Sequence, residues 1–136
     1  MPAPRHAERC YDRHSMRSYW IFSGCLVVWL ILGGLTDIAG APGAGEIMHT
    51  LHYPDYMLLI LGPCKLLAVA ALLYPKTRLL RERAYAGVTI DALGAFASHC
   101  AVHDDVFATV APLVMLAIAA GSYFLQPDHL RLAVRH

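Results

Sequence analysis

The sequence predicts an all-α membrane protein, an antiparallel bundle of four transmembrane helices. Its 136 residues are 57% hydrophobic and 15% charged, whereas soluble domains average about 45–50% apolar and about 25% charged residues. The charged residues are crowded between four apolar runs that reach the ~20 residues needed to cross a bilayer. This composition excludes a disordered chain and a disulfide-stapled secreted domain. A net charge of +1 gives no indication of a nucleic-acid partner.

The four predicted spans differ in the charges they contain. We expect them at residues 19–38, 56–74, 85–103 and 106–125. The first has no charged residue before Asp37, the second is interrupted only by Lys65, and the third contains Asp91. The fourth contains no charged residue. The third and fourth are separated by a short connection, so we expect these helices to be antiparallel neighbours.

The cations predict the orientation. They lie before the first span (Arg5, Arg9, Arg13, Arg17), in the second connection (Lys76, Arg78, Arg81, Arg83) and in the tail (Arg131, Arg135). The first and third connections contain neither lysine nor arginine. By the positive-inside rule both termini are cytoplasmic. We therefore expect a basic cytoplasmic segment (1–18), one transmembrane domain (19–127) and a cytoplasmic tail (128–136) in the plasma or inner membrane.

The first span resembles a signal peptide, because a basic segment precedes it and Ala39-Gly40-Ala41 follows it. The apolar region of a signal peptide is only ~7–15 residues long, however, and the run here is longer. Removing it would also place the tail on the other side of the membrane. We expect it to be retained, and we expect the glycine-rich residues 40–45 to form a flexible start to the first connection.

Lys65 and Asp91 are the charged residues that lie deepest inside the predicted spans. At ~1.5 Å per residue, Lys65 lies about 13 Å and Asp91 about 18 Å below the outer end of its span. A lysine side chain can reach across this difference in depth of roughly 5 Å. Charges at this depth usually face the bundle interior and have partners. The sequence therefore predicts a Lys65–Asp91 ion pair. The pair either fixes helix register or forms a polar site for a substrate, a quinone headgroup or a proton; alternatively, the two residues act independently.

Small residues share one face of the third span with the aspartate: Ala84, Gly87, Asp91, Ala95 and Ser98. Such a face allows close helix packing or lines a narrow pocket. Pro63 lies near Lys65 and removes a backbone donor from the second span. Our candidate intramembrane polar site consists of Lys65, Asp91, Ser98 and His99.

Histidines gather at the predicted outer face, where His49, His52, His99 and His103 form a candidate metal site. Zinc and copper take three or four such ligands at ~2.0–2.1 Å; the alternative is that these imidazoles are interfacial hydrogen-bonding groups. The four cysteines include no Cys-x-x-Cys pair, and no nucleophile–base, phosphate-loop or dinucleotide motif indicates a catalytic residue. The sequence therefore names no reaction.

The order of short motifs between residues 19 and 127 resembles the DoxX-like family of small four-span membrane proteins. The stretches are Tyr19-Trp20-Ile21-Phe22-Ser23-Gly24, Leu51-His52-Tyr53-Pro54-Asp55-Tyr56, Leu61-Gly62-Pro63-Cys64-Lys65-Leu66-Leu67, Ala84-Tyr85-Ala86-Gly87 and Ser98-His99. The chain departs from the family's usual pattern at His52 and Cys64. The resemblance implies a four-span fold and an association with membrane redox complexes that handle sulfur compounds and quinone.

Three functions follow as expectations. The first is an accessory or anchoring subunit of a membrane redox or assembly complex, as the resemblance implies. The second is a small membrane enzyme, or a protein that binds quinone or another small solute, with its site at Lys65 and Asp91. The third is a proton-coupled transporter. The expected partners are the lipid bilayer, subunits of a redox complex and a second copy of the chain.

Overall fold

The computed structural model describes residues 5–74 and 78–127, with side chains from Met16 onward, and this part of the chain contains helices and no strand. The helices are α1 (Arg5–Ile38), α2 (Pro42–Thr50), α3 (Tyr56–Leu73), α4 (Arg78–Ala101) and α5 (Val106–Phe124). The predicted all-α fold is therefore confirmed. The basic side chains before Met16, Lys76 and the tail after residue 127 lie outside the described part.

Three of these helices are long and apolar enough to cross a membrane: Met16–Ile38 within α1, α3 and α5. The fourth long helix, α4, is not among them, and it contains Asp91, His99 and many small residues. Two helices begin earlier than predicted, since α1 starts at Arg5 and α4 at Arg78. Both therefore include basic residues that were expected to precede the spans.

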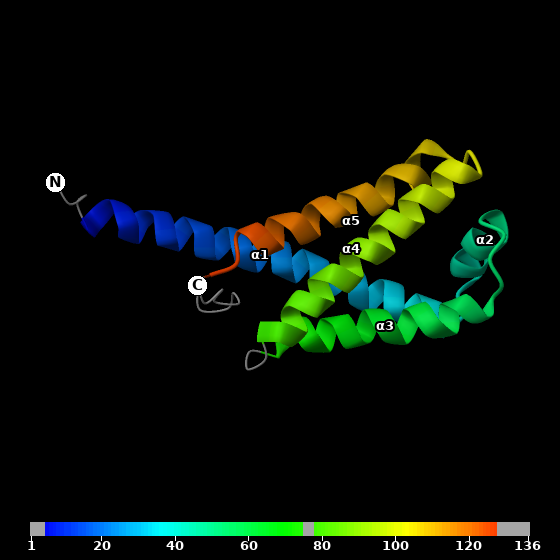
Figure 1. The fold of residues 1–136 in the computed structure, drawn as a ribbon, viewed down its shortest axis with the longest axis horizontal. Helices are drawn as coiled ribbons and strands as arrows, with labels where there is room; N and C mark the ends of the chain where they lie inside the picture. Colours follow the sequence, from blue (N-terminus) through cyan, green and yellow to red (C-terminus); the bar gives the residue numbers. More distant parts are fainter. Residues whose placement is uncertain (1–4, 75–77, 128–136) are drawn as a thin grey trace.

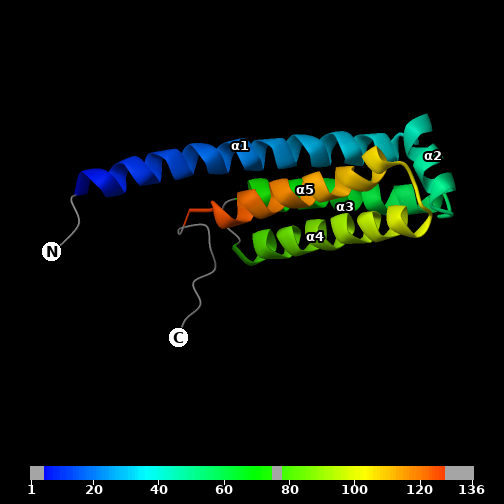
Figure 2. The same cartoon turned by 90° about the horizontal axis from the view of Figure 1, so that it is seen from above.

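The four long helices run alternately up and down and form a closed ring. Helix α1 packs against α3 and α5, and α4 packs against the same two helices from the opposite side (Figures 1 and 2). The start of α1, the end of α3, the start of α4 and the end of α5 lie towards one end of the bundle. Helix α2 and the α4–α5 connection lie at the other end (Figure 1). This is the end predicted to face outward.

The core lies between the four long helices. Leu26 and Leu30 of α1 pack with Val88 and Ala92 of α4 and with residues of α3 and α5. In contrast, many large apolar side chains point outward, such as Leu67 (68% exposed), Ile90 (71%) and Phe107 (86%). So much exposed apolar surface is unfavourable in water and matches a lipid bilayer.

The first connection is helical, which the sequence analysis did not predict. Gly40 adopts a left-handed conformation (φ 60°) that ends α1, and Pro42 starts α2, where its fixed φ favours a first helical turn. Met48 of α2 packs with Leu51 and Leu58 in a second small apolar cluster. The predicted flexible start of this connection is therefore wrong after Ala41, because the buried methionine ties α2 to the end of the bundle.

Candidate functional site

Two glycines bring α1 and α3 into close contact. A Cβ atom on Gly62 would lie 2.6 Å from Cγ1 of Ile38 and 2.9 Å from the carbonyl oxygen of Gly34. A Cβ on Gly34 would lie 3.0 Å from the carbonyl oxygen of Gly62. Neither position has room for a side chain, so the two backbones meet there, as small residues permit between helices in lipid.

This close contact determines the partner of Lys65. The lysine extends across Gly33, whose added Cβ would lie 3.7 Å from both Cδ and Nζ of Lys65. The ammonium donates a hydrogen bond to Oδ2 of Asp37 at 2.7 Å. The side chains of Lys65 and Asp37 are 23% and 10% exposed, so the ion pair is largely enclosed. It joins the first and second predicted spans.

The predicted Lys65–Asp91 ion pair is therefore wrong as a direct contact, because Lys65 is paired with Asp37. The prediction measured depth by counting residues from the outer end of each span, as if all spans ended at the same depth in the membrane. Instead, Gly62 lies beside Cβ of Asp37, and α3 starts six residues before Gly62, about 9 Å farther along at ~1.5 Å per residue. Helix α3 therefore extends beyond the end of α1, and Asp37 comes within reach of Lys65.

Asp91 nevertheless belongs to the same group of charges. It interacts electrostatically with both Lys65 and Asp37. Among the described residues, no lysine, arginine or histidine forms a direct ion pair with Asp91. We call Asp37, Lys65 and Asp91 the charge triad; its three members come from α1, α3 and α4.

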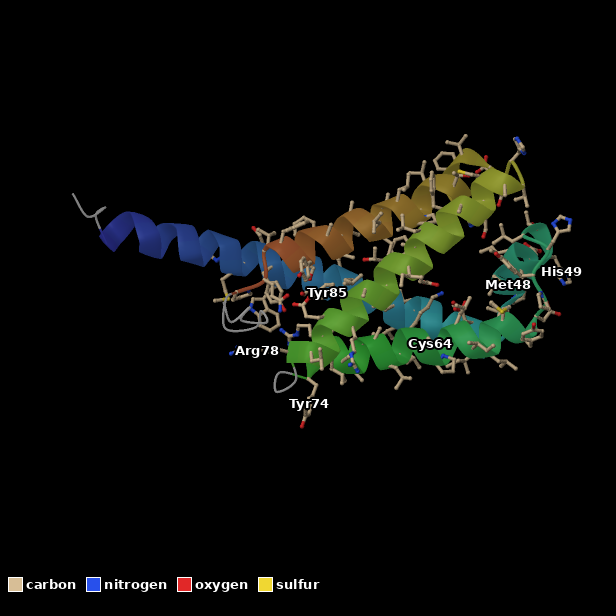
Figure 3. The ribbon with its side chains drawn as sticks, viewed as in Figure 1. Met48, His49, Cys64, Tyr74, Arg78 and Tyr85 are labelled. Carbon is tan, nitrogen blue, oxygen red and sulfur yellow. The ribbon has the colours of Figure 1, made fainter. Side chains whose placement is uncertain are left out.

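A groove of about 620 Å³ lies between α3 and α4 and exposes two members of the triad. Lys65 and Asp91 line it together with apolar side chains, and Arg83 also contributes to its lining. The apolar lining includes Leu61, Cys64 and Leu67 of α3 and Leu80, Gly87 and Ile90 of α4. Cys64 is labelled on α3 in Figure 3. The groove is thus largely apolar, with a carboxyl and an ammonium group among its lining side chains.

The small residues of α4 make room for this groove. Ala84, Gly87 and Asp91 of the predicted small-residue face all line it. A Cβ on Gly87 would meet no heavy atom within 4 Å, so this glycine does not mediate close helix packing. Of the two interpretations of this face, the pocket fits Ala84 and Gly87, while the close glycine contact lies instead between α1 and α3.

Ser98 and His99 do not join Lys65 and Asp91, although the candidate polar site grouped the four. The Ser98 hydroxyl donates to the carbonyl oxygen of Gly94 (2.8 Å) and is bonded to the Tyr53 hydroxyl (3.0 Å). Nδ1 of His99 lies 2.7 Å from Oδ2 of Asp104. Both residues follow Asp91 by about two helical turns, about 11 Å along α4.

His99 and Asp104 form a hydrogen-bonded pair at the α4–α5 connection. The other carboxylate oxygen, Oδ1, accepts a hydrogen bond from the backbone N–H of Asp105 at 2.7 Å. This backbone hydrogen bond, and then the bond to His99, hold the pKa of Asp104 below its ordinary value. The pair fixes the turn between α4 and α5, where His103 has a left-handed backbone (φ 53°).

The four histidines of the candidate metal site are not brought together. His49 lies 3.8 Å from a carboxylate oxygen of Asp55, and Nδ1 of His52 contacts the carbonyl oxygen of Thr50 at 3.1 Å. Across the described residues, no group of three or more His, Cys, Asp or Glu side chains could hold a metal ion. The predicted ligand set is therefore not assembled in the described part of the chain, although the Tyr53–Ser98 hydrogen bond brings the two turns into contact.

Sequence reasoning missed a buried hydroxyl network at the other end of the bundle. The Ser122 hydroxyl lies 2.7 Å from that of Tyr85 and 2.7 Å from that of Ser23, which links α4, α5 and α1. Nearby, Nη2 of Arg81 donates to the carbonyl oxygen of Leu72 at 3.0 Å and caps the end of α3. Sequence reasoning also missed Asp37 as the partner of Lys65. The Gly33-Gly34 pair, about one turn before Asp37, was a usable signal that another helix packs closely at this point.

Comparison with known proteins gives a family. The sequence model of the DoxX-like family matches residues 21–122, which include all three members of the charge triad and all residues that line the groove. No match was found among curated proteins or among solved structures.

Proposed function

The chain belongs to the DoxX-like family of membrane proteins, and on that premise we propose that it binds a lipophilic molecule of the quinone class between α3 and α4, as a subunit of a membrane redox complex. One observation carries this proposal: the α3–α4 groove combines apolar walls with the Lys65 ammonium and the Asp91 carboxyl. Ligand sites commonly have this form, with mostly apolar walls and a few convergent polar groups.

The proposal includes the arrangement in the membrane. We infer that α4 is a fourth span, because it is packed between α3 and α5 and exposes Ile90 and Leu93. The distribution of cations in the sequence supports cytoplasmic termini. A reporter active only in the cytoplasm, fused within residues 38–55 and separately at the C-terminus, should be inactive in the first fusion and active in the second. Activity in the first fusion would refute this orientation.

The groups on the groove suit a quinone. Its ring and isoprenoid tail would contact the leucine and isoleucine side chains, and its carbonyl oxygens would accept hydrogen bonds. Lys65 has three donor hydrogens, and the bond to Asp37 uses one of them. Asp91 offers a second donor when its carboxyl carries a proton. A bound quinone would supply two-electron redox chemistry, and the protein would hold and orient its head.

The role as a redox-complex subunit has separate support. The family resemblance in the sequence implies an association with membrane redox complexes. Purification from native membranes in a mild detergent should then recover the chain together with a redox enzyme. Recovery of the chain with no redox enzyme, after crosslinking as well as without it, would contradict this part of the proposal.

Binding itself is tested with decylubiquinone and the purified protein in lipid nanodiscs. Gly87→Leu would place a leucine in the groove, where an added Cβ meets open space. Gly94→Leu is the matched control, because it lies on the same helix, also has open space, and does not line the groove. We expect Gly87→Leu to weaken binding at least about tenfold, or about 1.4 kcal/mol, and Gly94→Leu to leave it unchanged. Equal affinities for the two variants, or no saturable binding to the wild type, would refute the proposal.

A further inference from the structure

The charge triad contains two carboxyl groups and only one ammonium group. Lys65 is hydrogen-bonded to Asp37 at 2.7 Å, and Asp91 has electrostatic interactions with both of them. Removing a charge from water is unfavourable unless a partner compensates it, and the penalty is larger at membrane depth. One ammonium group cannot compensate two carboxylates. The triad therefore needs one further positive charge.

The surrounding helices offer few other candidates for that charge. Helix α5 contains no Asp, Glu, Lys, Arg or His between Val106 and Phe124. On α3, Lys65 and the Cys64 thiol face the groove, and Asp37 is the member contributed by α1. On α4 itself, Arg83 lines the groove, but it precedes Asp91 by eight residues, about 12 Å along the helix. A proton is the simplest compensation.

The geometry also indicates which carboxyl group carries the proton. Asp37 is engaged by Lys65, and its Cβ is packed beside Gly62. Asp91 has no direct ion-pair partner among the described residues and lines the groove. We propose that the triad holds one exchangeable proton on Asp91, which presents it to the groove, so that binding of a carbonyl-bearing ligand requires the protonated carboxyl. The identity of that ligand rests on the proposed function; the proton on Asp91 does not.

The chemistry is a proton transfer and a hydrogen bond. In the neutral triad, the Asp91 carboxylic acid donates its O–H to a ligand carbonyl oxygen. When the pH rises, this O–H bond breaks, the proton passes to water and the electron pair stays on the carboxylate. The group can then only accept hydrogen bonds, and it repels a carbonyl oxygen.

The first test measures decylubiquinone binding in nanodiscs as a function of pH. Above the midpoint of the Asp91 titration, wild-type affinity should fall by about tenfold per pH unit, the slope for one linked proton. Asp91→Asn keeps a hydrogen-bond donor but cannot titrate, so it should bind with an affinity that is independent of pH. Glu82→Gln, on the same helix but outside the groove, should keep the wild-type pH dependence. Binding that does not depend on pH in the wild type, or that depends on it equally in Asp91→Asn, would overturn the proposal while leaving the proposed function standing.

The second test needs no ligand. Infrared spectra of wild-type protein carrying side-chain ¹³C-labelled aspartate should contain an isotope-shifted carboxylic-acid band at neutral pH. Asp37→Asn should weaken this band, because Lys65 then has only one carboxylate to compensate. Lys65→Met should strengthen it, because neither carboxylate then has a counter-charge. A wild-type spectrum with no protonated aspartate at neutral pH would overturn the proposal, and a band that appears without any quinone binding would support the proton and refute the ligand.

Discussion

Replacing Gly62 with alanine tests the close contact that brings Asp37 to Lys65. The added Cβ would lie 2.6 Å from Cγ1 of Ile38 and 2.9 Å from the backbone oxygen of Gly34. The isoleucine side chain can turn away, but the carbonyl oxygen is part of α1 and cannot. The helices must therefore separate, and overpacking of this kind costs typically about 1–3 kcal/mol.

Gly24→Ala and Gly94→Ala are the controls, because a Cβ at either position meets nothing within 4 Å. All three substitutions replace a helical glycine by alanine, so the gain in helix propensity is common to them. The free energy of unfolding, measured by denaturant titration in mixed micelles, should fall for Gly62→Ala by about 1–3 kcal/mol relative to the controls. If Gly62→Ala is as stable as Gly24→Ala, the inferred contact between α1 and α3 is wrong.

Three further predictions concern other contacts. Lys65→Met should lower stability more than Asp37→Asn, because the first leaves the carboxyl groups of Asp37 and Asp91 without a cation and the second leaves Lys65 near Asp91. Equal losses in chemical denaturation would contradict the charge count. Ser122→Ala removes the hydroxyl that joins Tyr85 and Ser23, and it should lower the free energy of unfolding by about 1–3 kcal/mol in the same assay. Ser18→Ala, on α1 outside this network, is the control and should change it little. Because the pKa of Asp104 is lowered in the folded state, its ionised carboxylate stabilises that state at pH values above the ordinary carboxyl pKa, and this contribution is lost as the pH falls through the lowered pKa. Asp104→Asn should therefore flatten the acid side of a plot of unfolding free energy against pH. An unchanged plot would contradict the role assigned to Asp104.

The helices could be predicted from the sequence because lipid leaves few alternatives. A backbone in hydrocarbon must satisfy its own hydrogen bonds, so an apolar run of sufficient length becomes a helix. The ends of α3 and α5 accordingly fall within a residue of the prediction. Helix α2 was not predicted, since its nine residues include two glycines and its position depends on burial of Met48.

The groove residues could be predicted only in part. Lys65 and Asp91 were found because ionisable residues are conspicuous in apolar runs. The partner of Lys65 was missed because residue counting gives depth along one helix and not the offset between two helices. That offset depends on where Gly34 and Gly62 meet. Ser98 and His99 share a helix with Asp91, but the turns that hold them involve Tyr53 and Asp104, which helical periodicity does not reveal.

Photocrosslinking with an azido-quinone tests most directly whether the α3–α4 groove is the ligand site. The probe would be added to the protein in nanodiscs, irradiated, and its adducts mapped by mass spectrometry with and without excess decylubiquinone. We predict adducts on α3 and α4 near Cys64, Leu67 and Ile90 that excess quinone suppresses. Adducts spread over the exposed face of α1 around Trp20 and Trp29, and unaffected by excess quinone, would show that the quinone meets this protein only as it meets any apolar surface.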